Sequence, residues 1–369
     1  MLDPRIEKLA KLLVHYSLEV KKGQNIFIRG TSLAEPLVEA AYKEAILAGA
    51  HPMVMVGSPN TQEIFFKNAS QEQLEYVSPG EKFVMENYDA FLNIMASFNT
   101  KALSGVDPKR IAVNRRATAE LQQLFMERAG KGELNWVLTG FPTNAAAQDA
   151  SMSLNEYQDF VFGAGLLDKD DPVAQWRRID AEQEKICRHL EGKSQLRIVS
   201  EDTDLSMDIS GRKWINCSGK QNFPDGEVFT GPVEDSVNGH IRFSFPGIYA
   251  GKEIEDIRLT FKDGKVVEAS AAKGEELLNA LLETDAGARY VGEVAVGTNF
   301  GIQKFTRNML FDEKIGGTVH LALGASYPES GGKNQSGIHW DMLCDMRQGG
   351  EIFADGEAIY KDGHFTIKF

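Results

Sequence analysis

The sequence has no long hydrophobic run, and this absence excludes one large class of proteins. A membrane-spanning helix needs about 18 or more consecutive apolar residues, and no stretch of the 369 residues reaches that length. The opening stretch carries Asp3, Arg5, Glu7 and Lys8, and it therefore lacks the apolar centre of a signal peptide. We expect a chain that neither spans a membrane nor is secreted.

Cysteines are few, and there is no excess of basic residues. The three cysteines, Cys187, Cys217 and Cys344, are odd in number and far apart, which fits reduced thiols better than a disulfide framework or a CxxC zinc site. We accordingly expect a cytoplasmic protein. The formal net charge of −13 provides no general basic surface for a phosphate backbone, so nucleic acid is not an expected partner.

The composition is otherwise that of an ordinary globular protein, with 42% hydrophobic and 25% charged residues. At roughly 150 residues per domain, the length favours two domains. A highly charged stretch with helical period, residues 170–193, precedes a change of pattern. We therefore predict an N-terminal α/β domain over residues 1–193 and a second domain over residues 194–369.

Strands and helices alternate in the first half. The sequence Ser32-Leu33-Ala34-Glu35 has the spacing of a capping box at the start of an amphipathic helix that ends near Gly49. Strands are expected at Asn25–Ile28, Met53–Val56, Ala90–Met95, Arg110–Asn114 and Asn135–Thr139, with helices such as Thr118–Arg128 between them. This alternation predicts an α/β fold with a mostly parallel, doubly wound sheet.

The second half has the period-2 alternation of half-buried β-strands, for example around Leu205, Met207 and Ile209. Three Asp-Gly pairs lie between such runs, at residues 263–264, 355–356 and 362–363, where hairpin turns with positive φ are expected. One helix is expected around residues 274–283. We predict a mainly antiparallel β domain with some helix.

The common catalytic motifs are absent. Gly163-Ala164-Gly165 lacks the third glycine of a dinucleotide fingerprint, and no Gly-Lys pair has the upstream glycine of a phosphate loop. The nucleophile-elbow pattern fails at Pro328, and no HExxH sequence exists. Nucleotide-binding, serine hydrolase and zincin functions therefore have little support.

Histidines and acidic residues in β segments remain as candidates for chemistry. His339 and Asp341 are two residues apart, so on a strand they project from one face and can converge on metal. His320, Glu227 and Glu293 lie in runs of apolar or small neighbours, where an inward-pointing charge needs a metal or a basic partner. Each residue taken alone is more often a satisfied core histidine or a solvated surface charge.

The chain resembles the dinuclear metalloaminopeptidases of the aminopeptidase T, aminopeptidase S and PepS type, the thermophilic metalloprotease family. The likeness extends from the N-terminal VKKGQNIFIRG, at residues 20–30, through FPDGEVFT at residues 223–230 and GEVA at residues 292–295. It ends with HLALG at residues 320–324 and NQSGIHWD at residues 334–341. The motifs are short individually but specific in this order.

The resemblance implies that Glu227, Glu293, His320, His339 and Asp341 hold two metal ions in the second domain. It also implies that the family's catalytic tyrosine is Tyr327. Glu227 or Glu293 is expected to relay a proton as a further catalytic group. Asn334 and Ser336 are close enough in sequence to orient His339, although loop residues can equally cap a turn.

A charge count also favours two ions. The three carboxylates carry −3, the two histidines are neutral as ligands, and two divalent ions supply +4, so that one hydroxide would neutralise the site. We expect metal-assisted hydrolysis, with Tyr327 as a hydrogen-bond or proton donor. The physiological metal is open among zinc, cobalt, manganese and magnesium, because carboxylate and imidazole ligands accept each of them.

The expected activity is that of an aminopeptidase acting on the N-terminal bond of short peptides. One alternative is a mononuclear iron dioxygenase that cleaves dihydroxypyridine rings, because such relatives use two histidines and one aspartate, here His320, His339 and Asp341. That site needs neither Glu227 nor Glu293, so hydrolysis is favoured. A non-catalytic binding protein is a third possibility. The resemblance further implies a homodimer whose N-terminal domains help to enclose the active-site cavity.

Overall fold

The computed structural model of the chain describes residues 3–367, which divide into two compact units. Unit 1 contains residues 3–173 and 219–224, and unit 2 contains residues 174–218 and 225–367. Most of helix α10 (Pro172–Glu191) thus belongs to unit 2. The predicted domain boundary after residue 193 stays a prediction, and it differs from this division in where it places α10 and residues 219–224.

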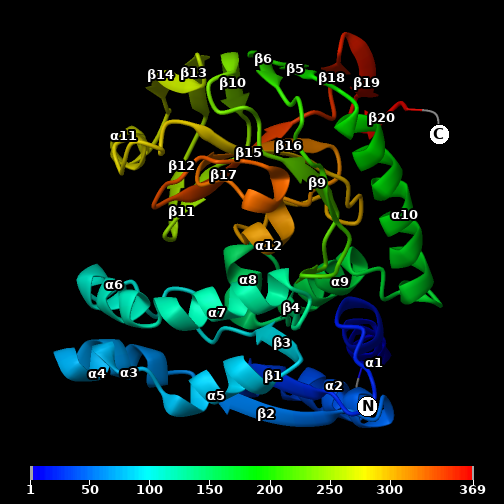
Figure 1. Cartoon of the computed structure of the whole chain (residues 1–369), viewed down its shortest axis with the longest axis vertical. Helices are drawn as coiled ribbons and strands as arrows, with labels where there is room; N and C mark the ends of the chain where they lie inside the picture. The colour runs from blue at the N-terminus through cyan, green and yellow to red at the C-terminus, as the bar shows by residue number, and fades with distance from the viewer. Residues whose placement is uncertain (1–2, 368–369) are drawn as a thin grey trace. The chain divides into compact units, whose positions relative to one another are not determined.

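Unit 1 is built on a five-stranded sheet with the order β2-β1-β3-β4-β8, in which every neighbouring pair is parallel (Figure 1). Its strands are β1 (Asn25–Thr31), β2 (His51–Gly57), β3 (Ala90–Met95), β4 (Asn135–Gly140) and β8 (Asn222–Phe223). Its helices are α1 (Pro4–Leu12), α2 (Glu35–Leu47), α3 (Thr61–Asn68), α4 (Gln71–Glu75), α5 (Pro79–Asn87), α6 (Pro108–Ala117), α7 (Ala119–Gly130), α8 (Asn144–Asp149) and α9 (Leu154–Ala164).

Two local expectations for unit 1 are wrong. The expected strand at Arg110–Asn114 lies inside helix α6, which begins at Pro108 with the Asp107 side chain accepting a hydrogen bond from the Lys109 amide. A short apolar run does not distinguish a strand from a helix, and this cap decides for the helix. The expected capping box at Ser32 is not formed either. Residues 32–34 form a 3₁₀ turn, and α2 begins at Glu35 without a side-chain cap.

Unit 2 contains an eight-stranded sheet of order β14-β13-β10-β6-β5-β18-β19-β20, a five-stranded sheet of order β17-β16-β15-β9-β7 and the hairpin β11-β12. The larger sheet and the hairpin comprise β5 (Gln195–Ser200), β6 (Thr203–Asp208), β10 (Asn238–Phe243), β11 (Gly247–Tyr249), β12 (Lys252–Ile254), β13 (Ile257–Lys262), β14 (Lys265–Ser270), β18 (Glu351–Ala354), β19 (Glu357–Lys361) and β20 (His364–Phe365). The smaller sheet comprises β7 (Ile215–Cys217), β9 (Glu227–Thr230), β15 (Val291–Gly297), β16 (Thr318–Gly324) and β17 (His339–Asp345), and the unit's other helices are α11 (Glu275–Leu282) and α12 (Met309–Asp312).

The strand pairs in unit 2 are antiparallel, and the expected hairpin turns are present. Asp263, Asp355 and Asp362 have φ of +49°, +50° and +46°, and each is followed by a glycine with positive φ. They connect β13 to β14, β18 to β19 and β19 to β20. The predicted fold class is confirmed: a parallel α/β sheet with helices, and a separate antiparallel region.

One apolar core joins the two sheets of unit 2. It contains Ile198, Leu205 and Ile241 from the larger sheet and Val294, Leu321 and other residues from the smaller one. Gln183 of α10, which is 2% exposed, donates hydrogen bonds to the carbonyl oxygens of Cys217 and Glu227 at 3.0 and 2.9 Å. This helix therefore holds strands β7 and β9 in place beside the core.

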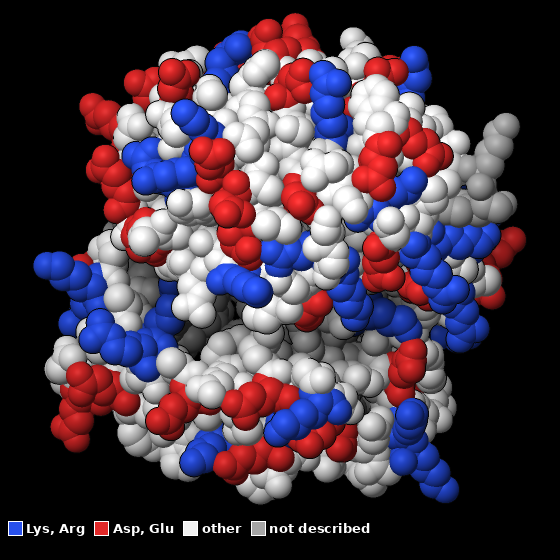
Figure 2. Space-filling model, turned by 45° about the horizontal axis from the view of Figure 1, so that its top comes forward, with Lys and Arg blue, Asp and Glu red and all other residues white. Residues whose placement is uncertain are grey.

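Charged side chains of both signs lie on the surface. On the face in Figure 2, Asp and Glu side chains are interspersed with Lys and Arg side chains. No helix among the described residues is both long enough and apolar enough to cross a membrane.

Candidate metal centre

Strands β15, β16 and β17 of the smaller sheet bring four of the five predicted ligands to one face. Glu293 of β15 is directly opposite Ala322 of β16, which in turn is opposite Asp341 of β17. Side chains alternate along a strand. His320 and His339, each two residues from one of these positions, therefore project from the same face.

Strand β9, which pairs with β15 on the side away from β16, contributes the fifth predicted ligand. Glu227 is opposite Gly297, which is four residues beyond Glu293 and so faces the same way. The structure thus brings together all five predicted ligands from four adjacent strands. Their role as ligands is taken up below.

Small residues occupy the remaining positions on this face of β15 and β16, and they make room for the functional side chains. These positions are Ala295, Gly297, Thr318, Ala322 and Gly324, all buried. A Cβ atom on Gly297 would lie 2.2 Å from the carbonyl oxygen of Ile315, and Gly324 has a φ of +104°. The opposite face carries Val294, Val296, Val319, Leu321 and Leu323, which pack into the core of unit 2.

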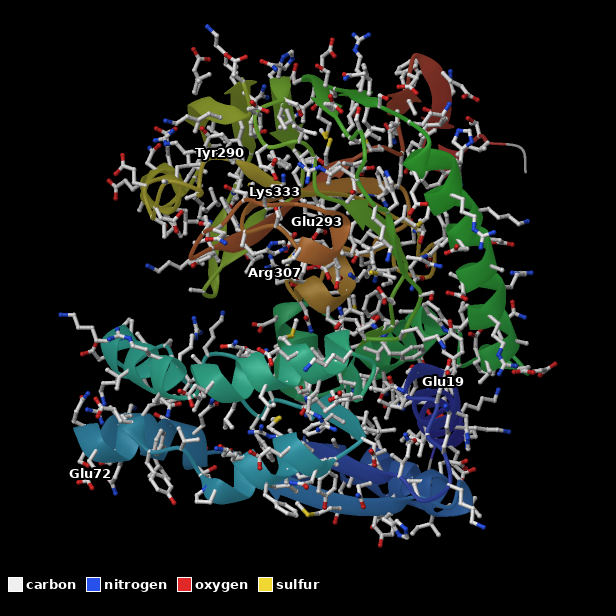
Figure 3. The ribbon with its side chains drawn as sticks, viewed as in Figure 1. Glu19, Glu72, Tyr290, Glu293, Arg307 and Lys333 are labelled. Atoms are coloured by element: carbon white, nitrogen blue, oxygen red, sulfur yellow. The ribbon has the colours of Figure 1, made fainter. Side chains whose placement is uncertain are left out.

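Glu293 lies at the middle of the cluster, and its two carboxylate oxygens reach two different histidines. Oε1 is 3.2 Å from Nε2 of His320, and Oε2 is 3.7 Å from Nε2 of His339. Figure 3 shows Glu293 among the strands of unit 2, and it is 4% exposed. Around it, His320 Nε2 is 3.3 Å from Glu227 Oε2, and His339 Nε2 is 3.6 Å from Asp341 Oδ1.

Several polar atoms of the cluster are buried without a hydrogen-bond partner. Glu227 Oε2, Asp341 Oδ1 and His320 Nδ1 have no hydrogen-bond partner among the described residues. An unpaired buried polar atom costs about 1–3 kcal/mol, and more if it is charged. Carboxylate oxygens and imidazole nitrogens are also the usual ligands of zinc, cobalt and manganese. The residues therefore fit divalent cations.

The cluster contains two candidate ligand groups that share one histidine. Glu227, Glu293 and His320 each offer an atom within 4.8 Å of the others, and so do Glu313, His320 and Asp341. The sequence analysis did not single out Glu313.

The ring of His339 is oriented by the backbone. Its Nδ1 is 2.8 Å from the carbonyl oxygen of Ala325, and because a carbonyl can only accept, Nδ1 carries the proton. Its unprotonated Nε2 faces the carboxylates of Glu293 and Asp341 and is available to bind a cation together with them. Such a bond on the far nitrogen is the usual way in which a metal-binding histidine is fixed.

Asn334 and Ser336 stabilise the segment before His339 without bonding to its ring. Asn334 Nδ2 donates to the carbonyl oxygens of Gly287 and Gly324 at 2.9 and 2.6 Å. Ser336 Oγ donates to Asp285 at 2.8 Å and accepts from the Ile338 amide at 3.2 Å. They act on the loop that leads into β17.

Tyr327 lies beside the cluster, three residues after the end of β16. Its ring is 5.0 Å from that of His339 and 5.4 Å from that of Phe229, and the residue is 41% exposed. Partial burial, together with Glu293 and Asp341, raises the pKa of Tyr327 above its usual value. The hydroxyl therefore remains protonated and can donate a hydrogen bond.

A buried lysine adjoins the cluster, and the sequence analysis missed it. Lys314 is 1% exposed, and its ammonium contacts Glu227 Oε1, lies 2.6 Å from Glu313 Oε1 and 3.6 Å from Asp225 Oδ1. The sequence Asp312-Glu313-Lys314 has the appearance of an exposed charged turn, so no local signal indicates this burial. Asp225 lies before β9 and is separated from it by Gly226, which has a φ of +125°, so strand alternation does not indicate its position either.

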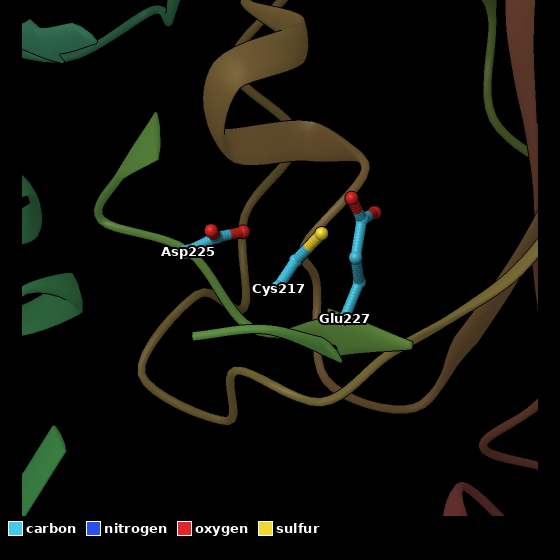
Figure 4. Close-up of side chains that lie close together, drawn as sticks. All are labelled: Cys217, Asp225 and Glu227. Carbon is cyan, nitrogen blue, oxygen red and sulfur yellow. The ribbon is translucent and has the colours of Figure 1, made fainter. Parts of the chain in front are cut away.

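Cys217 is also close to this acidic region. Figure 4 shows its side chain beside those of Asp225 and Glu227, with ligand atoms of all three within 4.8 Å of one another. Burial and the two carboxylates raise the pKa of the Cys217 thiol well above its usual value. The thiol is therefore neutral. The positive charge beside the carboxylates of Asp225 and Glu227 is the ammonium of Lys314.

Without a metal ion, the cluster favours protonated groups. Burial raises the pKa of Glu227 to about 8, although Lys314 opposes this. Burial lowers the pKa of His320, but its hydrogen bond to Glu293 and the nearby carboxylates outweigh that effect and raise it to about 9. Since metal ligands must lose these protons, cation binding should strengthen as the pH rises.

Unit 1 has a parallel α/β sheet, and unit 2 has an antiparallel sheet that gathers carboxylates and imidazoles on one face. Together these features indicate a metal-dependent enzyme. The family model described as thermophilic metalloprotease (M29) matches residues 2–365, and the chain belongs to this family.

Related proteins match over almost their whole length. Aminopeptidase 2 of Geobacillus stearothermophilus is 31% identical, covering 99% of this chain and 98% of that protein. Aminopeptidase AmpS of Bacillus subtilis is 29% identical, covering 98% of each. The solved structure of wild-type AmpT from Thermus thermophilus superposes with a TM-score of 0.85 at 25% identity, covering 99% of both chains. These likenesses do not favour the dioxygenase alternative.

Proposed function

We propose that the protein is a metal-dependent aminopeptidase that hydrolyses the N-terminal bond of short peptides with the help of two divalent cations. The observation that carries this proposal is the convergence of Glu227, Glu293, His320, His339 and Asp341 on one sheet face, with buried oxygen atoms that have no hydrogen-bond partner. The relatives named above are aminopeptidases, which supports the same conclusion.

The geometry suggests how the five ligands divide. Glu227 and His320 would hold one cation, and His339 and Asp341 the other. Glu293, with one oxygen toward each histidine, would contribute to both. The cations could be zinc, cobalt, manganese or magnesium, each of which accepts carboxylate and imidazole ligands.

Bound divalent cations lower the pKa of a water molecule toward about 7 and polarise the scissile carbonyl. The chain's own groups would supply the remaining steps. Glu293 or Glu227 would accept the proton of the attacking water and pass it to the departing amine. The protonated hydroxyl of Tyr327 would donate a hydrogen bond to the oxygen that becomes negative as the carbonyl is attacked.

We also propose that the protein acts as a homodimer in the cytoplasm. Strand β2 is at the edge of the parallel sheet, and its side chains Met53, Val54, Met55 and Val56 are 37–47% exposed. On the adjacent helix α2, Ile46 and Leu47 are 50% and 69% exposed. An apolar edge strand of this kind needs to be covered, and a second copy of the same chain would cover it.

The activity is tested by measuring bound metal and peptide hydrolysis together. We expect about two ions per chain, cleavage of unblocked dipeptides and no cleavage of N-acetylated ones. Glu293→Ala should lose metal and nearly all activity. Tyr327→Phe should keep both ions and lose about 10²-fold in kcat, as expected for one oxyanion donor.

Two results would refute the proposal. Equal cleavage of blocked and unblocked peptides would exclude aminopeptidase specificity. Full activity in Glu293→Ala would remove that residue from the site.

A further inference from the structure

We propose that the carboxylate of Glu313 binds the free α-ammonium group of the peptide substrate and that the buried Lys314 holds this carboxylate in place. Glu313 would then restrict cleavage to the first residue of a peptide. The inference rests on the proposed aminopeptidase activity and assigns a specificity role to a residue outside the five-ligand set.

Glu313 is the most accessible carboxylate of the cluster. Its side chain is 18% exposed, whereas those of Asp225, Glu227 and Glu293 are 2%, 7% and 5% exposed. The side chain of Asp341 is 12% exposed. A ligand atom of Glu313 is nevertheless within 4.8 Å of atoms on His320 and Asp341. Glu313 is therefore both next to the metal centre and open to an incoming cationic group.

Lys314 fixes the position of this carboxylate. Its ammonium is 2.6 Å from Glu313 Oε1 and is itself 1% exposed, so the ion pair is held inside the protein and not in solvent. One oxygen of Glu313 is thereby occupied. The second oxygen remains for the substrate.

The formal charges of the complete cluster are compatible with a cationic substrate group. Five carboxylates carry −5 (Asp225, Glu227, Glu293, Glu313 and Asp341) and Lys314 returns +1. Two divalent cations bring the total to zero, and it stays zero when Glu227 or Glu293 takes the proton of the attacking water, because that proton does not leave the site. The α-ammonium of an unblocked peptide therefore meets no net positive charge when it binds beside Glu313. An N-acetylated peptide brings no cationic group, so it would cover the Glu313 carboxylate without pairing its charge, which is expensive in a buried site.

The test compares Glu313→Gln, which removes the charge while keeping the shape, with the wild-type metal-loaded enzyme. We expect KM for an unblocked dipeptide to rise about 30-fold, the scale of one lost charge-assisted hydrogen bond. The value of kcat should change little. The preference for unblocked over N-acetylated peptide should fall by a similar factor, and the number of metal ions per chain should not change.

Binding measured without turnover gives an independent readout. By calorimetry, the wild type should bind leucinol, which carries the free amine, more tightly than isohexanol, which lacks it. Glu313→Gln should lose most of this difference. Glu276→Gln, which removes an equal charge from an exposed position on α11, should behave as the wild type in every measurement.

Unchanged KM and unchanged leucinol binding in Glu313→Gln would overturn the inference. Loss of a metal ion in this variant would also overturn it, because Glu313 would then be a metal ligand. If the metal-loaded wild type cleaves no unblocked peptide, the proposed function fails, and that result does not depend on the Glu313 variant.

Discussion

Lys314 carries a positive charge into the interior of unit 2, where Glu227, Glu313 and Asp225 surround it. A buried ammonium is tolerated only if it is paired, and a buried carboxylate likewise. Lys314 therefore compensates part of the negative charge of the cluster in a way that does not depend on metal. It also occupies one oxygen of Glu227, so that the other oxygen, Oε2, faces His320.

At this residue scale we predict that Lys314→Met destabilises the metal-free protein by about 3–5 kcal/mol, because two buried carboxylates lose their partner. Added divalent cations should recover part of this loss, since they neutralise the same carboxylates. Urea unfolding with and without a chelator measures both effects. Lys304→Met, at an exposed lysine, should stay within about 0.5 kcal/mol of the wild type. Equal effects of the two substitutions would contradict this account of Lys314.

At the scale of the structural element, the smaller sheet of unit 2 separates two functions on its two faces. Val294, Val296 and Leu321 pack into the core, while the other face alternates ligands with glycine and alanine. Only small residues leave enough space between strands for five long polar side chains. The sheet register thus determines both stability and the site.

We therefore predict that Ala322→Val lowers the number of bound metal ions, because two added methyl groups between Glu293 and Asp341 push the ligands apart. The cost in unfolding free energy should be about 1–3 kcal/mol, typical of overpacking. Val296→Ile adds one methylene group on the opposite face and should have a similar cost while keeping the metal. Metal analysis and chemical denaturation of both variants provide the check. Retention of both ions in Ala322→Val would show that this face can hold a larger side chain, and it would contradict the requirement for small residues there.

At the scale of the whole molecule, the proposed dimer depends on the exposed edge strand β2. We expect the wild type to sediment at twice the chain mass of 40.8 kDa. The double substitution Val54→Lys and Val56→Lys should shift it to the monomer mass, because charged residues on an edge oppose strand pairing. Val267→Lys is the control on another edge strand, since Val267 on β14 is 50% exposed and Val54 and Val56 are 37% and 47% exposed. A wild-type monomer at micromolar concentration would remove the dimer from the proposal.

Local patterns were sufficient for most elements. The Asp-Gly pairs predicted three hairpin turns because few residue pairs accept positive φ at both positions. The strand expected at Arg110–Asn114 failed because an apolar run of that length is compatible with a helix, and the cap at Asp107 decided between them. Neither result required knowledge of distant contacts.

The candidate ligands were also accessible from sequence, since period-2 spacing places His339 and Asp341 on one face whatever the partner strand. Glu313, Lys314 and Asp225 were not identified, because whether a charged side chain is buried depends on which distant segments pack against it. The triplet Asp312-Glu313-Lys314 resembles a surface turn, and yet Asp312 and Lys314 are buried.

The sequence by itself determined several of the strands, which side chains share a strand face and which residue types could bind metal, because these properties depend on neighbours a few positions apart. Only the tertiary structure decided that Glu227, Glu293, His320 and Asp341 meet, since antiparallel pairing between distant segments sets that register. It also decided the burial of Lys314, and with it the charge of the site, because burial depends on the packing of the whole unit.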